Sequence, residues 1–250
     1  MWSVVLVTLA FAKPPKEPVK PIVPEVDVAT KWMRDSEEYR LLAEQTYRLA
    51  QGAVLAEAAA LPAGAKWAVV MDADETAIDN IQFQLENDLF SDAAWDAWEL
   101  RAEAKTTPGA RAFTDAVHHA GGTIAFVTNR HDPVSSKIVL EKNGLMGATD
   151  LLCTARPGVA ATIPNAVAPP KWISEKRTRR TEIRTGTGAC SWGAPVLVLG
   201  WFGDQMGDFP EADELPADPL TLSPWGRQYF MLPNPMYGKW ERTPNRMVTW

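Results

Sequence analysis

Cysteine, basic charge and long apolar runs are all scarce in this chain of 250 residues. Its two cysteines, Cys153 and Cys190, cannot form a four-thiolate zinc site, and they fit either one disulfide or two unpaired thiols. The formal charge is 25 − 31 = −6, which argues against a general binder of nucleic-acid polymers, because such proteins usually carry a basic footprint. Beyond the first residues, no stretch is apolar enough to predict a transmembrane helix.

The first 26 residues differ in composition from the rest. Residues 1–12 form a short apolar segment ending in Ala10-Phe11-Ala12, which is typical of an export signal and is too short to span a bilayer. Residues 13–26 carry five prolines and predict an extended tether. We expect a periplasmic or secreted protein without a lipid anchor, since no cysteine lies near the predicted cleavage site. A stray N-terminal strand would explain the same apolar residues.

From residue 27 onward, apolar runs alternate with helical patterns. Over residues 27–60 the sequence predicts one or two helices with a stripe of Tyr39, Leu42, Thr46, Leu49, Ala53 and Ala56. Continuous apolar runs predict strands at 66–71, 123–127, 151–153 and 195–199, with helices at 108–120, 133–143 and 175–183. The alternation predicts an α/β fold, a parallel sheet covered by helices on both faces.

Polar residues follow three of the predicted strands. They are Asp72 and Asp74, Thr128 and Asn129, and Asp204 and Asp208. In a parallel α/β sheet, ligands bind outside the carboxyl ends of the strands. We therefore expect these six side chains to gather at one edge of the sheet.

Asp72 and Asp74 are the first candidates for chemistry. Alternate residues at a strand end point the same way, so the two carboxylates face one small volume. Carboxylates so close need a proton or a cation between them, and Mg²⁺ prefers such oxygen ligands. One aspartate can attack phosphorus, and the other can act as general acid and then as general base. A solvated acidic turn would carry the same two residues.

Each of the other motifs also has a functional and a purely structural explanation. Thr128 and Asn129 can donate to phosphate oxygens without adding charge, or can cap a helix. Lys176, in a basic segment, can offset carboxylate and phosphate charge, or can lie on a solvated helix face. Asp204 can complete a metal site and Asp208 can orient Lys176, although both also suit a turn.

Taken in order, these motifs resemble the four-motif signature of the haloacid dehalogenase (HAD) superfamily. Longer segments resemble the class C acid phosphatases, which include bacterial outer-membrane lipoprotein 5′-nucleotidases. These segments are VVMDADETAIDN at 69–80, FVTNR at 126–130, GDQMGDF at 203–209 and LPNPMYGKWE at 232–241. The resemblance runs from about Trp32 to Glu241 and implies a Rossmann-like HAD domain over 27–250. A small helical cap lobe would lie at approximately 81–107, after the first motif.

The resemblance also implies a Mg²⁺ site. Asp72 corresponds to the nucleophile and a metal ligand, and Asp74 to the acid/base residue, whose backbone carbonyl also binds the metal. Asp204 corresponds to the remaining protein ligand. Gly207 stands where the family usually has a further acidic residue, a change that spares the three ligand positions.

Phosphate and substrate positions follow in the same way. Thr128, with Asn129, corresponds to the phosphate-binding hydroxyl segment, Lys176 to the third-motif lysine, and Asp208 to its supporting carboxylate. Trp95 and Tyr237 resemble in position two aromatic residues that sandwich the base in the lipoprotein nucleotidases. The segment 185–195 is longer than usual for the family.

The expected function is hydrolysis of small phosphomonoesters by a Mg²⁺-dependent acid phosphatase, through an aspartyl-phosphate intermediate. Nucleoside monophosphates are the expected substrates. Two alternatives remain open: a phosphotransferase or a sugar or aryl phosphate phosphatase on the same fold, and a non-catalytic surface protein that binds a ligand. The intact set of four aspartates argues against the second alternative. The sequence leaves the oligomeric state open.

Overall fold

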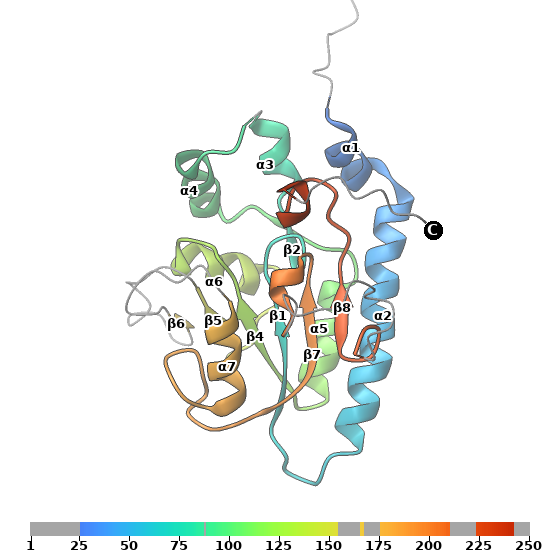
Figure 1. Cartoon of the computed structure of the whole chain (residues 1–250), viewed down its shortest axis with the longest axis vertical. Helices are drawn as coiled ribbons and strands as arrows, with labels where there is room; N and C mark the ends of the chain where they lie inside the picture. The colour runs from blue at the N-terminus through green and yellow to red at the C-terminus, as the bar shows by residue number, and fades with distance from the viewer. Residues whose placement is uncertain (1–25, 88, 155–165, 168–175, 211–223, 243–250) are drawn as a thin grey trace, which may run out of the picture.

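The computed structural model describes residues 26–87, 89–154, 166–167, 176–210 and 224–242. Within them, six parallel strands form one sheet in the order β6-β5-β4-β1-β7-β8 (Figure 1). The strands are β1 (Trp67–Met71), β4 (Thr123–Val127), β5 (Leu151–Cys153), β6 (Ala166–Val167), β7 (Leu197–Gly203) and β8 (Tyr229–Met231). The predicted parallel α/β sheet is confirmed. The predicted export signal, and all but the last residue of the proline-rich tether, lie outside the described residues.

Helices cover both faces of this sheet. On one face lie α2 (Glu37–Ala59), α5 (Ala110–His119) and α6 (Pro133–Lys142), and on the other lies α7 (Arg177–Thr185). Side chains of β1 alternate between the faces: Val69 and Met71 pack in the larger core cluster, while Val70 packs with Ile183 of α7. Two apolar layers therefore fix β1 at the centre of the molecule.

The N-terminal helical region contains α1 (Val28–Asp35) and α2, separated by Ser36, whose side chain caps α2 by accepting from the Tyr39 amide at 3.1 Å. The predicted helices are confirmed, but the apolar stripe was only partly right: of its six residues, only Tyr39 is buried, and Ala53 packs against the core. Leu42 and Leu49 are 44% and 60% exposed, whereas the neighbouring Ala43 is fully buried. The face of α2 that packs in the core carries Ala43, Tyr47, Ala50 and Val54, which leaves the leucines outside.

The strand predicted at 195–199 begins later and runs on to Gly203. Trp201 and Phe202 pair with β1 on one side and with β8 on the other, which extends the strand beyond its apolar start. The edge strand β8 was missed, because three residues inside a proline-rich stretch give little periodic signal.

A small helical lobe stands outside the carboxyl end of the sheet (Figure 1). It contains α3 (Ile81–Glu86) and α4 (Asp92–Arg101), and its stem is the antiparallel pair β2 (Ile78–Asp79) and β3 (Lys105–Thr106). Phe83 packs edge-on against Trp95, with ring centres 5.1 Å apart, and lies 6.2 Å from Trp98. We call α3, α4 and their connection the cap.

Two short 3₁₀ helices, η2 (Met206–Asp208) and η5 (Lys239–Arg242), complete the described elements. Cys153 and Cys190 form a disulfide, which decides between the two alternatives that the sequence allowed. In the described part of the chain, no helix combines the length and apolarity needed to cross a bilayer.

Candidate active site

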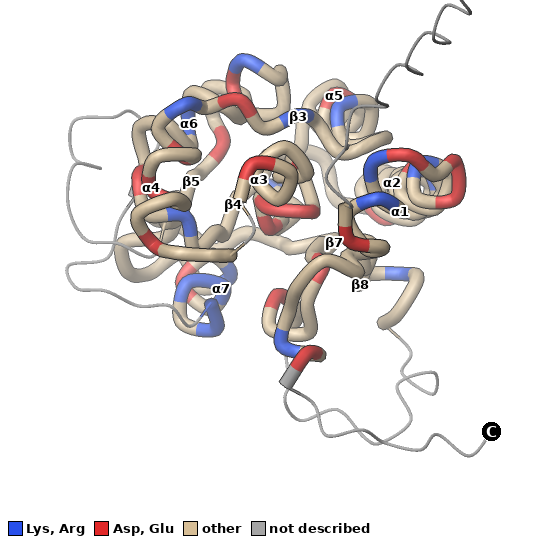
Figure 2. Tube along the Cα trace, turned by 90° about the horizontal axis from the view of Figure 1, so that it is seen from above, with Lys and Arg blue, Asp and Glu red and all other residues tan. Residues whose placement is uncertain are grey.

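The candidate site lies where the direction of strand order changes. β1 is flanked by β4 on one side and by β7 on the other, and the chain fills the sheet outward from this centre. Such a switch point opens a crevice at the carboxyl ends of the strands. Seen from above that end, α3 and acidic residues beneath it lie near the centre, and the basic residues of α7 lie to one side (Figure 2).

Asp72 follows β1 directly and is 7% exposed. The side-chain nitrogen of Lys176 forms an ion pair with Oδ1 of Asp72 and lies 2.7 Å from Oδ1 of Asp208. Lys176 stands at the N-terminal cap position of α7, and Asp208 ends η2 after β7. The fold thus brings together three predicted residues from widely separated parts of the chain.

The turn after Asp72 is tight and partly strained. The amides of Ala77 and Ile78 both donate to the carbonyl of Ala73 at 2.9 Å, so the chain reverses at once. Glu75 has a φ of 53°, a left-handed conformation that is uncommon for a non-glycine residue. Its buried carboxylate accepts a hydrogen bond from the backbone N–H of Asn80 at 2.7 Å, which holds the turn in place. Backbone strain of this kind persists where the surroundings over-determine it, often at functional sites.

Three carboxylates form an acidic cluster. One oxygen each from Asp72, Asp204 and Asp208 lies within 4.8 Å of the others. Asn234 donates to Oδ2 of Asp204 at 2.7 Å, while the buried Oδ1 of Asp204 has no hydrogen-bond partner among the residues that the structure describes. Buried oxygens rarely lack a partner, and hard divalent cations take such ligands. The residues therefore fit a divalent metal ion.

The electrostatics of this cluster also favour a cation. Burial raises the pKa of Asp72 to about 7, and Asp208 and Asp74 add to the increase although Lys176 opposes it. Burial likewise raises the pKa of Asp204 well above its ordinary value. Burial alone would lower the pKa of Lys176, but Asp208 and Asp72 outweigh it and raise the pKa above its usual range. One lysine does not neutralise the cluster, so a bound cation would stabilise it.

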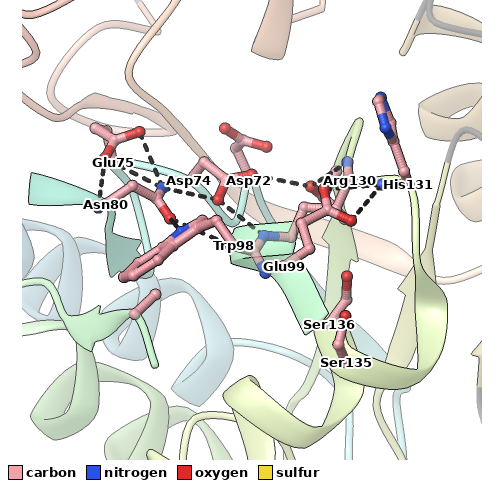
Figure 3. A network of polar contacts seen from close by, with 12 residues as sticks. Asp72, Asp74, Glu75, Asn80, Trp98, Glu99, Arg130, His131, Ser135 and Ser136 are labelled. Atoms are coloured by element: carbon pink, nitrogen blue, oxygen red, sulfur yellow. Dashed lines mark hydrogen bonds and ion pairs between the residues drawn. The ribbon is translucent and has the colours of Figure 1, made fainter. Parts of the chain in front are cut away.

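Asp74 points into a separate set of donors, shown in Figure 3. Its Oδ1 accepts from Arg130 Nε and from Asn80 Nδ2, each at 2.9 Å. Its Oδ2 lies 3.4 Å from Oγ1 of Thr128. The two aspartates of the first motif therefore have different surroundings.

The predicted phosphate-binding residues line the same edge. Thr128 is buried, and its Oγ1 accepts from the Arg130 amide at 3.1 Å. Asn129 is exposed, and Arg179 donates to its side-chain oxygen and to the carbonyl of Thr128, the latter at 2.6 Å. Arg179 thus connects α7, which begins beside Lys176, to the end of β4.

The two predicted substrate-binding aromatics lie in different settings. Trp95 of α4 is half-buried, packs against Phe83 and lies 6.1 Å from the ring of Phe90. Tyr237 is half-buried in the segment before η5, and within the described residues its ring makes no aromatic contact with Trp95. Trp95 therefore supports the cap, and its contact with a substrate stays a prediction.

Four site residues were not singled out from the sequence: Asn80, Arg130, Arg179 and Asn234. Asn80, Arg130 and Asn234 occur inside the segments that carry the family resemblance. Their place within these segments is the one signal that the sequence gives. The contacts of Arg130 with Asn80 and Asp74 join residues 50 and 56 positions apart, and such distant contacts leave no periodic pattern.

In this structure the central strand β1 leads directly into Asp72, and Asp72 pairs with Lys176 inside a carboxylate cluster. This is the arrangement of the HAD phosphatases, a class that generally uses a divalent metal. The family described as HAD superfamily, subfamily IIIB (Acid phosphatase) matches residues 16–240, so the chain belongs to this family. It is a phosphoric monoester hydrolase.

Solved structures agree. The chain is similar to the class C acid phosphatase from Bacillus anthracis, with 25% identity, 85% of each chain covered and a TM-score of 0.65. The structure of that class C acid phosphatase with tungstate bound gives 24% identity, the same coverage of each chain and a TM-score of 0.67. The resemblance inferred from the motifs is confirmed.

Proposed function

We propose that this acid phosphatase is a Mg²⁺-dependent enzyme that hydrolyses small phosphomonoesters, with 5′-nucleotides as favoured substrates, through an aspartyl-phosphate intermediate. The observation that carries the proposal is that the side chains of Asp72 and Asp74 have different contacts. Asp72 faces Lys176 in the acidic cluster, whereas Asp74, two residues on, is held by Arg130, Asn80 and Thr128. These different surroundings support a role in attack for Asp72 and a role in proton transfer for Asp74.

The chemistry has two steps. A carboxylate oxygen of Asp72 forms a bond to phosphorus, the bond from phosphorus to the ester oxygen breaks, and that oxygen takes its proton from Asp74. The products are the free alcohol and an acyl phosphate on Asp72. Asp74, now a carboxylate, removes a proton from water as the water attacks phosphorus, which releases phosphate and restores Asp72. Lys176 and Thr128 bind phosphate oxygens, and Asp208 keeps Lys176 in position.

Mg²⁺ would be held by Asp72, Asp204 and the backbone carbonyl of Asp74. Oδ1 of Asp204, which has no hydrogen-bond partner in the described part of the chain, and the raised pKa of Asp72 support a cation at this cluster. When bound, Mg²⁺ supplies positive charge that offsets the phosphate and the clustered carboxylates.

The substrate proposal rests on the cap. Trp95 is half-buried beside Arg130, and Tyr237 precedes η5, which lies at the same end of the sheet as the cap (Figure 1). Stacking on aromatic rings tolerates any base, because every base has a flat π-face. A nucleoside monophosphate would place its base between the cap and the C-terminal segment.

We also propose that the protein is exported, to the periplasm or the medium. The Cys153–Cys190 disulfide supports this, because structural disulfides persist in oxidising compartments. The apolar segment 1–12 has the features of a signal, and it lies outside the described residues. Fractionation of the producing cells, with disulfide content measured by thiol labelling, tests this assignment.

The deciding experiment is a substrate panel. Phosphate release is measured from nucleoside monophosphates, sugar phosphates and p-nitrophenyl phosphate, after chelation and after return of Mg²⁺, across pH. We expect Mg²⁺-dependent release, an optimum on the acid side of neutrality and a preference for nucleotides. Full activity without metal, or a rate on nucleotides and sugar phosphates that climbs steadily from about pH 5 to about pH 9, contradicts the mechanism. Alcohol release in excess of phosphate release would indicate a phosphotransferase.

A further inference from the structure

A buried arginine lies beside Asp74. Arg130 comes shortly after β4, and its side chain is 1% exposed. Its Nε donates to Oδ1 of Asp74 at 2.9 Å, and its Nη2 donates to Oδ1 of Asn80 at 3.2 Å. The guanidinium carbon lies 5.5 Å from the ring centre of Trp95 in the cap. Arg130 therefore contacts both the acid/base residue and the lobe that covers the site.

Asn80 is the second donor to Asp74. Its Nδ2 reaches Oδ1 of Asp74 at 2.9 Å, while its own Oδ1 accepts the indole N–H of Trp98 at 2.8 Å (Figure 3). An indole nitrogen can only donate, so Trp98 must face the oxygen of the Asn80 amide. That contact turns the NH₂ group of Asn80 toward Asp74. The orientation of Asn80 is thus set from α4 of the cap.

The two oxygens of Asp74 differ in what surrounds them. Oδ1 accepts from both Arg130 and Asn80, whereas Oδ2 has, within the described residues, only the long contact with Oγ1 of Thr128. An oxygen that accepts two N–H donors cannot also carry a proton without displacing one of them. Oδ2 is therefore the oxygen of Asp74 that is left to exchange a proton with a substrate.

We propose that Arg130 is a positioning residue for protonation of the leaving group. Together with Asn80 it holds Asp74 through Oδ1, so that Oδ2 carries the proton that passes to the ester oxygen as the phosphorus–oxygen bond breaks. This inference rests on the proposed function, because it requires Asp74 to be the acid. The cap contributes through Trp98, which orients Asn80.

A comparison of two substrates with different leaving groups distinguishes positioning of the acid from general structural support. p-Nitrophenolate departs without a proton because its charge is delocalised, whereas the alkoxide of glycerol phosphate needs one. The ratio kcat/KM reports the steps up to departure of the leaving group. A residue that positions the acid should therefore matter for glycerol phosphate and much less for p-nitrophenyl phosphate.

For Arg130→Met, we expect kcat/KM on glycerol phosphate to fall by about 100-fold or more, the size of a general-acid contribution. The fall on p-nitrophenyl phosphate is much smaller. Arg130→Lys restores part of the glycerol phosphate activity, because an ammonium group can still donate to Asp74. The matched control is Arg111→Met, which removes an exposed arginine paired with Asp115 on α5. It should leave kcat/KM on both substrates unchanged.

Trp98→Phe tests the same idea with every charge in place, and it decides the matter if Arg130→Met does not fold. It removes the N–H that orients Asn80 and keeps an aromatic ring in the cap. We expect a smaller loss, again confined to glycerol phosphate. Equal losses on both substrates, or undiminished activity on glycerol phosphate, overturn the proposal. If the unaltered protein hydrolyses neither substrate, the proposed function itself is wrong.

Discussion

The side-chain nitrogen of Lys176 lies 2.7 Å from Oδ1 of Asp208, and on its other side it pairs with Asp72. The two partners come from the first and last motifs of the chain, and the lysine comes from the third. The ammonium group of Lys176 therefore connects three segments at the carboxyl end of the sheet. Within the described residues, Oδ1 of Asp204 has no hydrogen-bond partner and is available to a metal ion.

Asp72→Asn should abolish turnover and leave the fold intact. The amide cannot form the acyl phosphate, and loss of one essential group in a concerted site costs about 10⁴-fold or more in kcat. Phosphate release gives the activity, and circular dichroism reports the fold. Asp115→Asn, on the exposed surface of α5, is the control and should be fully active. Near-normal turnover in Asp72→Asn would exclude covalent catalysis by this residue.

Metal affinity should depend on Asn234 as well as on the carboxylates. Asn234 donates to Oδ2 of Asp204 at 2.7 Å and so directs the other oxygen toward the acidic cluster. Outer partners of metal ligands typically contribute about 10–100-fold in affinity, so Asn234→Ala should weaken Mg²⁺ binding by that factor. A titration of Tm with Mg²⁺ measures it without relying on activity. Unchanged affinity in Asn234→Ala, or in Asp204→Asn, would show that the metal binds elsewhere.

Without metal, the protein should be more stable in mild acid than in mild alkali. Burial raises the pKa of Asp72 to about 7 and that of Asp204 well above its ordinary value. The folded state then holds protons that the unfolded state releases, so this contribution to stability is lost as pH rises from about 4 through about 7. Chemical denaturation of chelated protein at several pH values measures the slope. Asp204→Asn should make the slope shallower; an identical slope would mean that Asp204 is ionised in the fold.

The disulfide should stabilise the region around α7. Cys153 and Cys190 are 37 positions apart, and closing a loop of this length contributes about 4 kcal/mol in the chain-entropy description. The carbonyl of Cys153 also accepts from the amide of Thr128 and from Arg179, so the bridge stands beside phosphate-site contacts. Cys153→Ser with Cys190→Ser should lower the free energy of unfolding by a few kcal/mol. Insensitivity of the parent protein to reductant would contradict this.

Trp95 and Tyr237 should matter for nucleotides more than for simple esters. Stacking on a base contributes about 1–3 kcal/mol, or roughly ten- to hundredfold in kcat/KM. Trp95→Ala and Tyr237→Ala should therefore lose this factor on a 5′-nucleotide and much less on glycerol phosphate. Because Trp95 also packs against Phe83, the comparison of the two substrates is essential. Equal losses on both would mean that the rings support the cap and do not contact the base.

Much of the fold was accessible from the sequence because its signals are local. The short apolar run before Asp72 predicts a buried strand from its own residues, and Gly121 and Gly144 stand just past helical patterns that do end there. The buried face of α2 was not accessible in this way. Leucine at 42 and alanine at 43 both fit a helix, and only the packing of α2 against the sheet decides that Ala43 faces inward.

By itself, the sequence determined the alternation of strands and helices, the order of the acidic motifs and hence the edge of the sheet where they meet, since parallel strands share one carboxyl end. The tertiary structure decided which side chains touch there. That Lys176 stands between Asp72 and Asp208, and that Arg130 and Asn80 hold one oxygen of Asp74, depends on close approach between residues up to 104 positions apart. Such contacts arise from packing of the whole domain, and so no local pattern encodes them.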